Sequence, residues 1–418
     1  MHYEYQKYTE MLSFLRLSLF IFNIFFFFAT FSQTANSLFE AGEKKFHEKD
    51  YTAAIAEFTK CVEKNEFFYE AYTGRGNCYV MQKNFDAALK DFNKAIEIFP
   101  KYYQAYTLRG KVYAELKDFK KAIADYGKTI ELKPEYEEAY LARAELYSRS
   151  NDLKQAFSDL TKAILINSEN QETYLKRAAV SEKLKKEKDA LADYTAAIKI
   201  KATLAEAYYR RGLIYEKESK YSLAASDFLK ATELKMSNKD IHSHCATVCF
   251  LSGNYEKAAE HITMLLTIFN LKDAKLYYKR AICYYHTDKL EEALKDFTKS
   301  SQLDPKNDSA HLYMAKLYIS RHNSKSAQLC YTKAINANAG NAEAYAGRAS
   351  LWFTQNKYEA ALNDYNNALR IIPCAEWYFF RSECKEALND LKGMCDDIKS
   401  SAALGYPKAT KVLEAKCQ

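Results

Sequence analysis

Small and aromatic residues recur along the chain with a helical spacing, and the clearest copy runs from Tyr103 to Pro134. Counted from Tyr106, small or aromatic residues follow at +4, +7, +16 and +20, and a proline follows at +28. Residues three, four or seven apart lie on one face of a helix, so the pattern predicts two helices with facing apolar stripes. The polar pair Lys117-Asp118 interrupts the pattern and predicts the turn between the helices.

The same spacing recurs 34 residues earlier, from Tyr72, and can be followed through the chain as a repeat. We count eleven copies, whose reference residues are Leu38, Tyr72, Tyr106, Tyr140, Tyr174, Tyr208, His242, Tyr277, His311, Tyr345 and Tyr378. The phase changes twice, because one residue is added before Tyr277 and one is lost before Tyr378. The pattern therefore predicts an all-α array over residues 33–406, with residues 407–418 forming a C-terminal capping helix over the last apolar face.

The 34-residue unit resembles the tetratricopeptide repeat (TPR) family in its reference tyrosine, its glycine or alanine at +4, its alanine at +16 and its proline at +28. The resemblance implies a right-handed superhelical solenoid of about eleven helix-turn-helix (TPR) hairpins. It also implies that protein or peptide partners bind along the concave face formed by the first helices, without naming the partner. The last 26 residues, from Gly393, resemble the closing repeat of exported bacterial members of the family.

The N-terminal residues 1–32 read as a signal peptide. The run from Leu17 to Phe31 has no charge, and its 15 residues are shorter than the ~20 that a membrane-spanning helix needs. Thr30 and Ser32 are small residues suited to cleavage before Gln33, and the same pattern holds if translation starts at Met11. We therefore expect an exported protein of the periplasm or cell envelope. The same features fit a eukaryotic secretory lumen, and the alternative is an assembly factor held to the membrane by an uncleaved segment.

No residue pattern in the chain indicates catalysis. The 61 basic and 54 acidic residues are mixed along the helices and give a net charge of +7, which indicates a solvated surface and no nucleic-acid partner. Nucleophile elbows, phosphate-binding loops and zinc-binding helices are lacking. Four histidines gather in copies seven and eight, but two of them occupy packing positions; they are His242, His244, His261 and His286. We expect a non-enzymatic scaffold with no metal and no cofactor.

Three positions vary together among the repeats: tyrosine at the reference position, arginine at +3 and aspartate at +19. All three occur in eight copies, and copies one, seven and nine lack all three. Because a lone buried charge is costly, the pattern predicts a partly buried Arg–Asp ladder between first and second helices. Its pairs are Arg75 and Asp91, Arg109 and Asp125, Arg143 and Asp159, Arg177 and Asp193, Arg211 and Asp227, Arg280 and Asp296, Arg348 and Asp364, and Arg381 and Asp397. The alternative is an arginine row for acidic ligands; under the ladder hypothesis, Arg211→Ala destabilises the fold more than it changes binding.

The positions of the ten cysteines in the repeat distinguish packed thiols from a possible disulfide. Cys78, Cys283 and Cys384 share the position +6, where small buried residues are needed, so we expect packed thiols there. Cys395 and Cys417 are the pair that we expect to form a disulfide, which would fasten the terminal helix to the last hairpin.

The positions −2, +1, +5 and +8 are those that the family resemblance places along the binding face. They are mostly polar in the first half of the array, and an acidic residue recurs at −2, which disfavours an acidic partner. In copies six, eight and nine these positions are more apolar, which favours a protein or peptide partner there. The candidate binding residues are Tyr209, Leu213, Tyr278, Ile282, Tyr285, Leu312, Lys316 and Ile319. The alternative is that neighbouring repeats cover these side chains.

Overall fold

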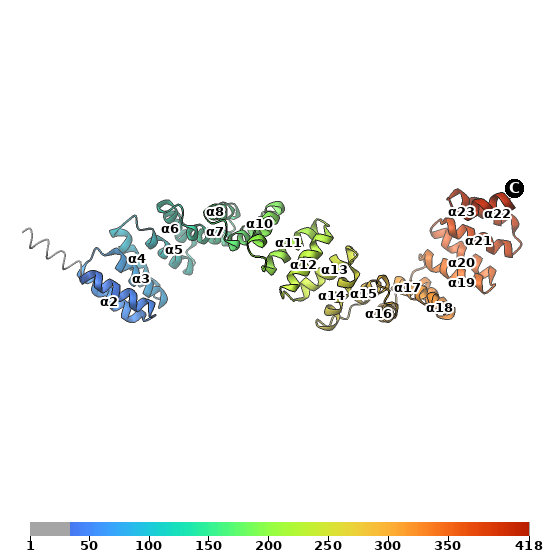
Figure 1. Cartoon of the computed structure of the whole chain (residues 1–418), viewed down its shortest axis with the longest axis horizontal. Coiled ribbons are helices and arrows are strands. Elements are labelled where there is room, and N and C mark those ends of the chain that lie inside the picture. The colour runs from blue at the N-terminus through green and yellow to red at the C-terminus, as the bar shows by residue number, and fades with distance from the viewer. Residues whose placement is uncertain (1–33, 418) are drawn as a thin grey trace, which may run out of the picture. The chain divides into compact units, whose positions relative to one another are not determined.

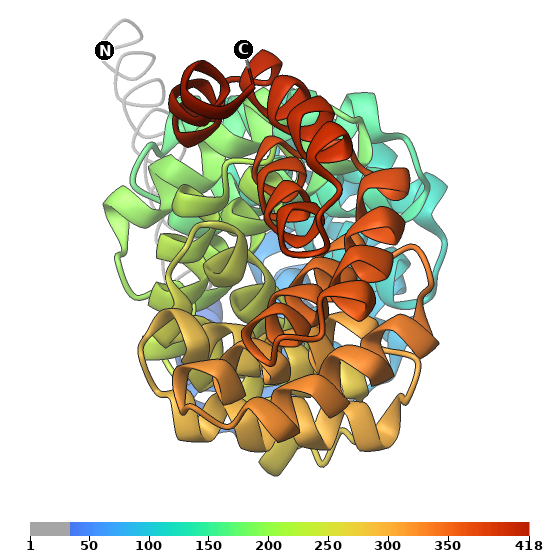
Figure 2. The same cartoon turned by 90° about the vertical axis from the view of Figure 1, so that its right-hand side faces the viewer.

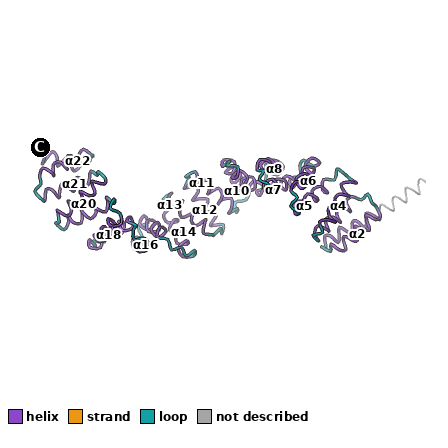
Figure 3. Tube along the Cα trace, turned by 180° about the vertical axis from the view of Figure 1, so that it is seen from behind, coloured by secondary structure: helices purple, strands orange, loops and turns teal. Residues whose placement is uncertain are grey.

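The structure, a computed structural model, describes residues 34–417 (Figure 1). The predicted signal peptide, and with it the choice between cleavage and anchoring, lies outside the described residues. Helices and short turns make up residues 34–417, and no strand occurs among them (Figure 3). The prediction of an all-α array of helical hairpins is confirmed. None of the helices in this part of the chain combines the length and the apolar character that a bilayer crossing requires.

The chain divides into two compact units between Ala207 and Tyr208, a point that falls within α11 (Ala205–Lys217). The first unit contains a helix over residues 34–47, followed by α2 (Tyr51–Lys64), α3 (Tyr69–Met81), α4 (Phe85–Ile98), α5 (Tyr103–Glu115), α6 (Phe119–Leu132), α7 (Glu137–Arg149), α8 (Leu153–Ile166), α9 (Gln171–Lys183) and α10 (Glu187–Ile200). The second unit continues with α12 (Tyr221–Glu233), α13 (Lys239–Leu251), α14 (Tyr255–Thr267), α15 (Ala274–His286), α16 (Leu290–Leu303), α17 (Asp308–Ser320), α18 (Ser324–Ala337), α19 (Ala342–Thr354), α20 (Tyr358–Ile371), α21 (Ala375–Ala387), α22 (Leu391–Ala403) and α23 (Pro407–Lys416).

Odd-numbered helices from α3 to α21 are the first helices of their hairpins, and the even-numbered helices that follow them are the second helices. The turn inside hairpin three shows how a hairpin is closed. Lys117 adopts a left-handed backbone conformation with φ of 62°, and the Asp118 side chain then caps α6 by accepting a hydrogen bond from the backbone N–H of Lys121. The polar pair Lys117-Asp118 therefore ends α5 and begins α6, as the sequence predicts.

Small residues let the two helices of a hairpin approach each other. A Cβ atom on Gly76 would lie only 2.8 Å from the Phe92 ring, so the aromatic residue at +20 fills the space that the missing side chain leaves. Phe92 is fully buried, as is Ala88 at +16. Phe228 and Phe297 occupy the same position in hairpins six and eight and are fully buried too. These aromatic-on-small contacts form the core of the eight hairpins that have an aromatic residue at +20, and a leucine or isoleucine takes that position in the other three.

The last hairpin is covered by α23. In both views of the fold, α21, α22 and α23 pack side by side (Figures 1 and 2). Pro407 begins α23, a position where its missing N–H has no helical partner to lose. Val412 and Leu413 of this helix pack against the cluster of buried side chains around Ile398.

Candidate functional site

All eight predicted Arg–Asp pairs are joined by two hydrogen bonds, from Nε and Nη2 of the arginine to the two carboxylate oxygens. In hairpin three, Arg109 Nε donates to Asp125 Oδ2 over 2.8 Å and Nη2 donates to Oδ1 over 2.7 Å. The other pairs span 2.6 to 2.9 Å. The aspartates are buried, and Asp125 is only 5% exposed. Each pair joins the first helix of a hairpin to the second.

The reference tyrosine completes the unit. In seven of the eight hairpins the guanidinium carbon lies 5.3 to 5.9 Å from the centre of that ring, within the range of a cation–π contact. Arg143 lies instead over Tyr147, at 5.9 Å. The hydrogen bonds that Arg109 donates to Asp125 raise the pKa of Arg109. Burial raises the pKa of Asp193, although the hydrogen bond from Arg177 opposes this shift. The co-variation of tyrosine, arginine and aspartate therefore has a direct geometric basis.

A third arginine contact, which the sequence reasoning missed, crosses from one hairpin to the preceding one. Arg109 Nη1 donates to Asn93 Oδ1 over 2.6 Å, and Arg280 Nη1 donates to the Thr263 hydroxyl over 3.0 Å. Thr59, Thr161, Thr332 and Asn366 accept the same bond from Arg75, Arg177, Arg348 and Arg381. All six acceptors stand at +21 of the preceding copy, so threonine or asparagine at that position was the available signal.

In hairpin seven a histidine pair replaces the tyrosine and the aspartate. The Nδ1 atoms of His242 and His261 lie 2.8 Å apart, and His242 Nε2 lies 3.1 Å from the Ser237 hydroxyl. Both rings are buried. One Nδ1 must carry the shared proton and the other must accept it, which is satisfied when both rings are neutral. Burial lowers the pKa of His242, and burial followed by repulsion from His242 lowers the pKa of His261 to about 4.

Six of the eight candidate binding residues, all in the second unit, keep part of their side chains at the surface, and the most open of them is Ile319, which is 39% exposed. Tyr209, Leu213, Tyr278, Tyr285 and Lys316 are half-buried. Two candidates fit the alternative interpretation instead, because Ile282 and Leu312 are 6% and 8% exposed and belong to the core around Phe297. These two are packing residues in the structure.

The aromatic residues of hairpins eight and nine form one connected group. The Tyr313 ring stacks on Phe297 with 5.3 Å between centres and meets Tyr285 edge-on at 5.3 Å. Tyr278 lies 6.4 Å from Tyr313. Lys316 places its ammonium group 5.3 Å from the centre of the Tyr313 ring and 2.7 Å from a Glu343 carboxylate oxygen. The group thus offers partly open rings beside a lysine that already has an ionic partner.

A pocket of about 430 Å³ lies between α13, α14 and α15. It therefore falls among the first helices of hairpins six to nine, which carry the candidate binding residues. Ser243 and Thr247, which occupy positions +1 and +5 of hairpin seven, are part of its wall. Sequence reasoning passed over this hairpin because its residues at these positions are polar. The signal that could have found the pocket is the residue inserted before Tyr277, which lengthens the connection beside it.

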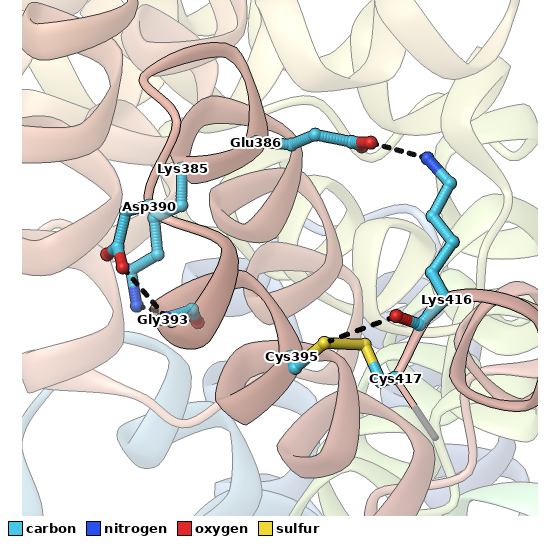
Figure 4. Close-up of a disulfide and its surroundings, with 7 residues drawn as sticks. All are labelled: Lys385, Glu386, Asp390, Gly393, Cys395, Lys416 and Cys417. Atoms are coloured by element: carbon cyan, nitrogen blue, oxygen red, sulfur yellow. Dashed lines mark hydrogen bonds and ion pairs between the residues drawn. A yellow bond between two sulfur atoms is a disulfide. The ribbon is translucent and has the colours of Figure 1, made fainter.

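The sulfur atoms of Cys395 and Cys417, which are 22 positions apart in the sequence, are bonded to each other (Figure 4). Lys416, next to Cys417, also pairs with Glu386, so α23 is tied to both α21 and α22. Cys78, Cys283 and Cys384 are buried free thiols. Among the residues that the structure describes, no group of three or more histidine, cysteine or acidic side chains is arranged to hold a metal ion.

Comparison with known proteins gives matches to tetratricopeptide repeat models over residues 69–102, 103–136, 137–170, 205–238, 274–307 and 313–389, which together make up more than half of the chain. Similar solved structures include MamA (25% identity, 38% of this chain and 94% of that chain, TM-score 0.37), YrrB, described as a TPR protein with an unusual peptide-binding site (25%, 44% and 95%, 0.37), and PilF of Pseudomonas aeruginosa (17%, 48% and 92%, 0.39). These TM-scores are all below 0.5, so the family assignment rests on the repeat matches and on the hairpins themselves. The chain belongs to the tetratricopeptide repeat family.

Proposed function

We propose that this protein is a non-enzymatic scaffold that binds a protein or peptide along the first helices of its second unit. The observation that carries the proposal is the connected aromatic group of hairpins eight and nine, in which Tyr278, Tyr285 and Tyr313 are only half-buried. Tyrosine rings that are held in place by neighbours lose little freedom on binding, and they are frequent anchors in protein interfaces.

The Arg–Asp ladder is a weaker candidate for the partner-binding surface. Each guanidinium of the ladder donates two hydrogen bonds to a buried carboxylate of its own hairpin, so its positive charge is already paired within the protein and attracts an acidic ligand less. The partner surface therefore consists of Tyr209, Leu213, Tyr278, Tyr285 and Ile319, with Lys316 at its edge.

Site-specific crosslinking in the cells that make the protein tests the proposal. A photoreactive phenylalanine analogue replaces Tyr285 on α15 in one variant and Lys295, an exposed residue of the second helix α16, in the control. We expect defined crosslinked partners from position 285 and none of the same partners from position 295. Equal capture from both positions, or no capture from position 285, would refute the assignment of this surface.

We further propose that the protein acts outside the cytoplasm, in the periplasm or cell envelope. The support is the apolar run from Leu17 to Phe31 and the disulfide between Cys395 and Cys417, a bond that persists in oxidising compartments. Mass spectrometry of the native chain gives the test. A first residue at Gln33 supports export with cleavage, whereas a retained N-terminus in the membrane fraction supports the membrane-anchored assembly factor.

A further inference from the structure

The pocket between α13, α14 and α15 combines an apolar floor with a basic rim. Ile262 and Leu265 of α14 close its floor and are almost fully buried. Lys239 at the start of α13, Lys272 in the connection and Lys279 on α15 line its edge. Its volume of about 430 Å³ exceeds what one carboxylate group fills and lies within the range of ligand-binding clefts.

The inserted residue gives this pocket its shape. The helix α14 ends at Thr267, and the chain then makes a wide turn in which Asn270 has a φ of 50° and the Leu271 N–H bonds to the Leu265 carbonyl over 3.1 Å. Leu271 and Lys272 line the pocket as a result. These connection residues distinguish the pocket from the one of about 490 Å³ in the first unit, which is lined by residues of α5 and α7 such as Lys111 and Arg149.

The lysines at the rim have no close ionic partner within the protein. Among the described residues, none of Lys239, Lys272 and Lys279 has a carboxylate oxygen within 4.0 Å of its ammonium nitrogen. Asp273 also lines the pocket, where its carboxylate caps α15 by accepting the Lys275 N–H, so the lining carries three positive charges and one negative charge.

The pocket walls leave the lysines as the available donors. The Ser243 hydroxyl donates to the Lys239 carbonyl over 2.9 Å, and the Thr247 hydroxyl donates to the Ser243 carbonyl over 2.9 Å. Both hydroxyl protons are therefore in use, and an anion in the pocket would be held by ammonium groups. The acidic residue that recurs at −2 in other hairpins is replaced by Lys275 in hairpin eight, which removes a source of repulsion there.

We infer that this pocket binds an acidic segment of the protein partner, whose carboxylates meet the three lysines while a neighbouring apolar side chain lies on Leu271 and Leu276. The inference rests on the proposed function, because it names the chemistry of the partner for one part of the same row of helices. Charge complementarity selects the occupant, since three unpaired lysines at the mouth of an apolar pocket favour aspartate and glutamate beside an apolar residue.

Selection from a random dodecapeptide phage library on the immobilised full-length protein tests the inference. The binding of selected peptides is then measured by fluorescence anisotropy to the wild-type protein, to the triple variant Lys239→Gln, Lys272→Gln, Lys279→Gln, and to a matched control. The control removes the same charge from exposed lysines of second helices in the same unit, as Lys295→Gln, Lys299→Gln, Lys333→Gln. Circular dichroism checks that all three proteins are equally folded.

We expect selected peptides to carry aspartate or glutamate next to an apolar residue. Each lysine of an exposed ion pair contributes about a two- to fivefold change in affinity, so the pocket variant should bind about tenfold more weakly or worse, with little change in the control. Binding should also weaken when the salt concentration is raised from about 0.15 to about 0.5 M, because salt screens the attraction between the lysines and the carboxylates.

Other results overturn the inference in distinguishable ways. Peptides that lack acidic residues, or that bind the pocket variant as tightly as the wild type, refute the acidic-segment inference, and the proposed function stands if Tyr285→Ala still weakens their binding. A library that yields no peptide sensitive to either the lysine changes or Tyr285→Ala counts against both.

Discussion

The substitution Arg109→Ala tests whether the ladder stabilises the fold. It removes both hydrogen bonds to Asp125, which is 5% exposed, together with the bond from Nη1 to Asn93 and the contact with the Tyr106 ring. The buried carboxylate is then left without a cationic partner. Breaking a buried ion pair by removing one member typically costs about 3 to 5 kcal/mol. Because the Arg109 side chain is 19% exposed and water can reach the vacated space, we expect a loss near the lower end, about 3 kcal/mol.

Replacing both members distinguishes the cost of an orphaned charge from the value of the pair. The double variant Arg109→Met, Asp125→Leu leaves no buried charge at this site. We therefore expect its free energy of unfolding to be about 1 to 2 kcal/mol higher than that of Arg109→Ala. Lys111→Ala, an exposed change on the same helix, serves as the control and should fall within about 0.5 kcal/mol of the wild type.

Urea unfolding followed by circular dichroism measures the overall effect, and hydrogen exchange of the α5 and α6 amides measures the local one. The second assay is needed because a repeat array does not have to unfold in a single step. The ladder hypothesis fails if Arg109→Ala is as stable as Lys111→Ala, or if it abolishes partner binding while the exchange of α5 and α6 stays unchanged. The second outcome would favour the alternative, an arginine row for acidic ligands.

Three further predictions address the packing, the turns and the histidine pair. Gly76→Ala should lower stability by about 1 to 3 kcal/mol because its Cβ would lie 2.8 Å from a buried ring. At Gly110 the nearest atoms are 3.3 Å away, so Gly110→Ala should be neutral or should stabilise by up to about 1 kcal/mol, because alanine favours the helix. The midpoints of urea unfolding of both variants check this. Lys117→Gly should stabilise by about 0.5 kcal/mol, since glycine adopts the φ of 62° without strain but loses more entropy on folding; thermal unfolding checks the sign. His261 has a pKa of about 4 in the folded protein and about 6.5 in the unfolded chain, so the unfolded state binds more protons between these values. About 3 kcal/mol of stability that is present above pH 6.5 should therefore disappear as the pH falls towards 4. Urea unfolding at a series of pH values checks this, and the dependence of stability on pH should be weaker in His261→Gln, in which His242 has no titrating neighbour.

The sequence was sufficient for the fold because the same physical requirement recurs in most of the eleven copies. A glycine or alanine at +4 has to face a large apolar residue at +20, which is aromatic in eight copies, and a contact such as that of Gly76 with Phe92 follows from the spacing. The ladder was predictable for a related reason, since the joint loss of arginine and aspartate in three copies exposes their dependence on each other.

The candidate site was less accessible to the same reasoning. Ile282 and Leu312 occupy positions that the resemblance places along the binding face, yet they are buried in the core around Phe297. The depth of a side chain depends on the side chains around it as well as on its position in the repeat. The basic rim of the pocket includes Lys272, which belongs to the connection lengthened by the inserted residue, and the repeat spacing does not predict the course of that connection. Periodicity reports what the repeats share, so it contains little information on features that occur once.

The arginine bond to the preceding hairpin sets the geometry between hairpins, because a guanidinium that holds two helices of its own hairpin and one of its neighbour allows a single orientation. Hairpins seven and nine have Cys245 and Met314 in place of that arginine. Their junctions with the preceding hairpins combine buried apolar groups such as Ile241 and Leu317 with one polar contact each to a carboxylate, between His244 and Glu216 and between Arg321 and Glu291. The Glu291 side chain is 71% exposed and the His244 side chain 34%, so these contacts restrain the orientation less than a guanidinium beside a buried aspartate does. The second unit therefore contains two joints with a weaker directional restraint, one before hairpin seven and one after hairpin eight, on either side of the two hairpins that form the pocket.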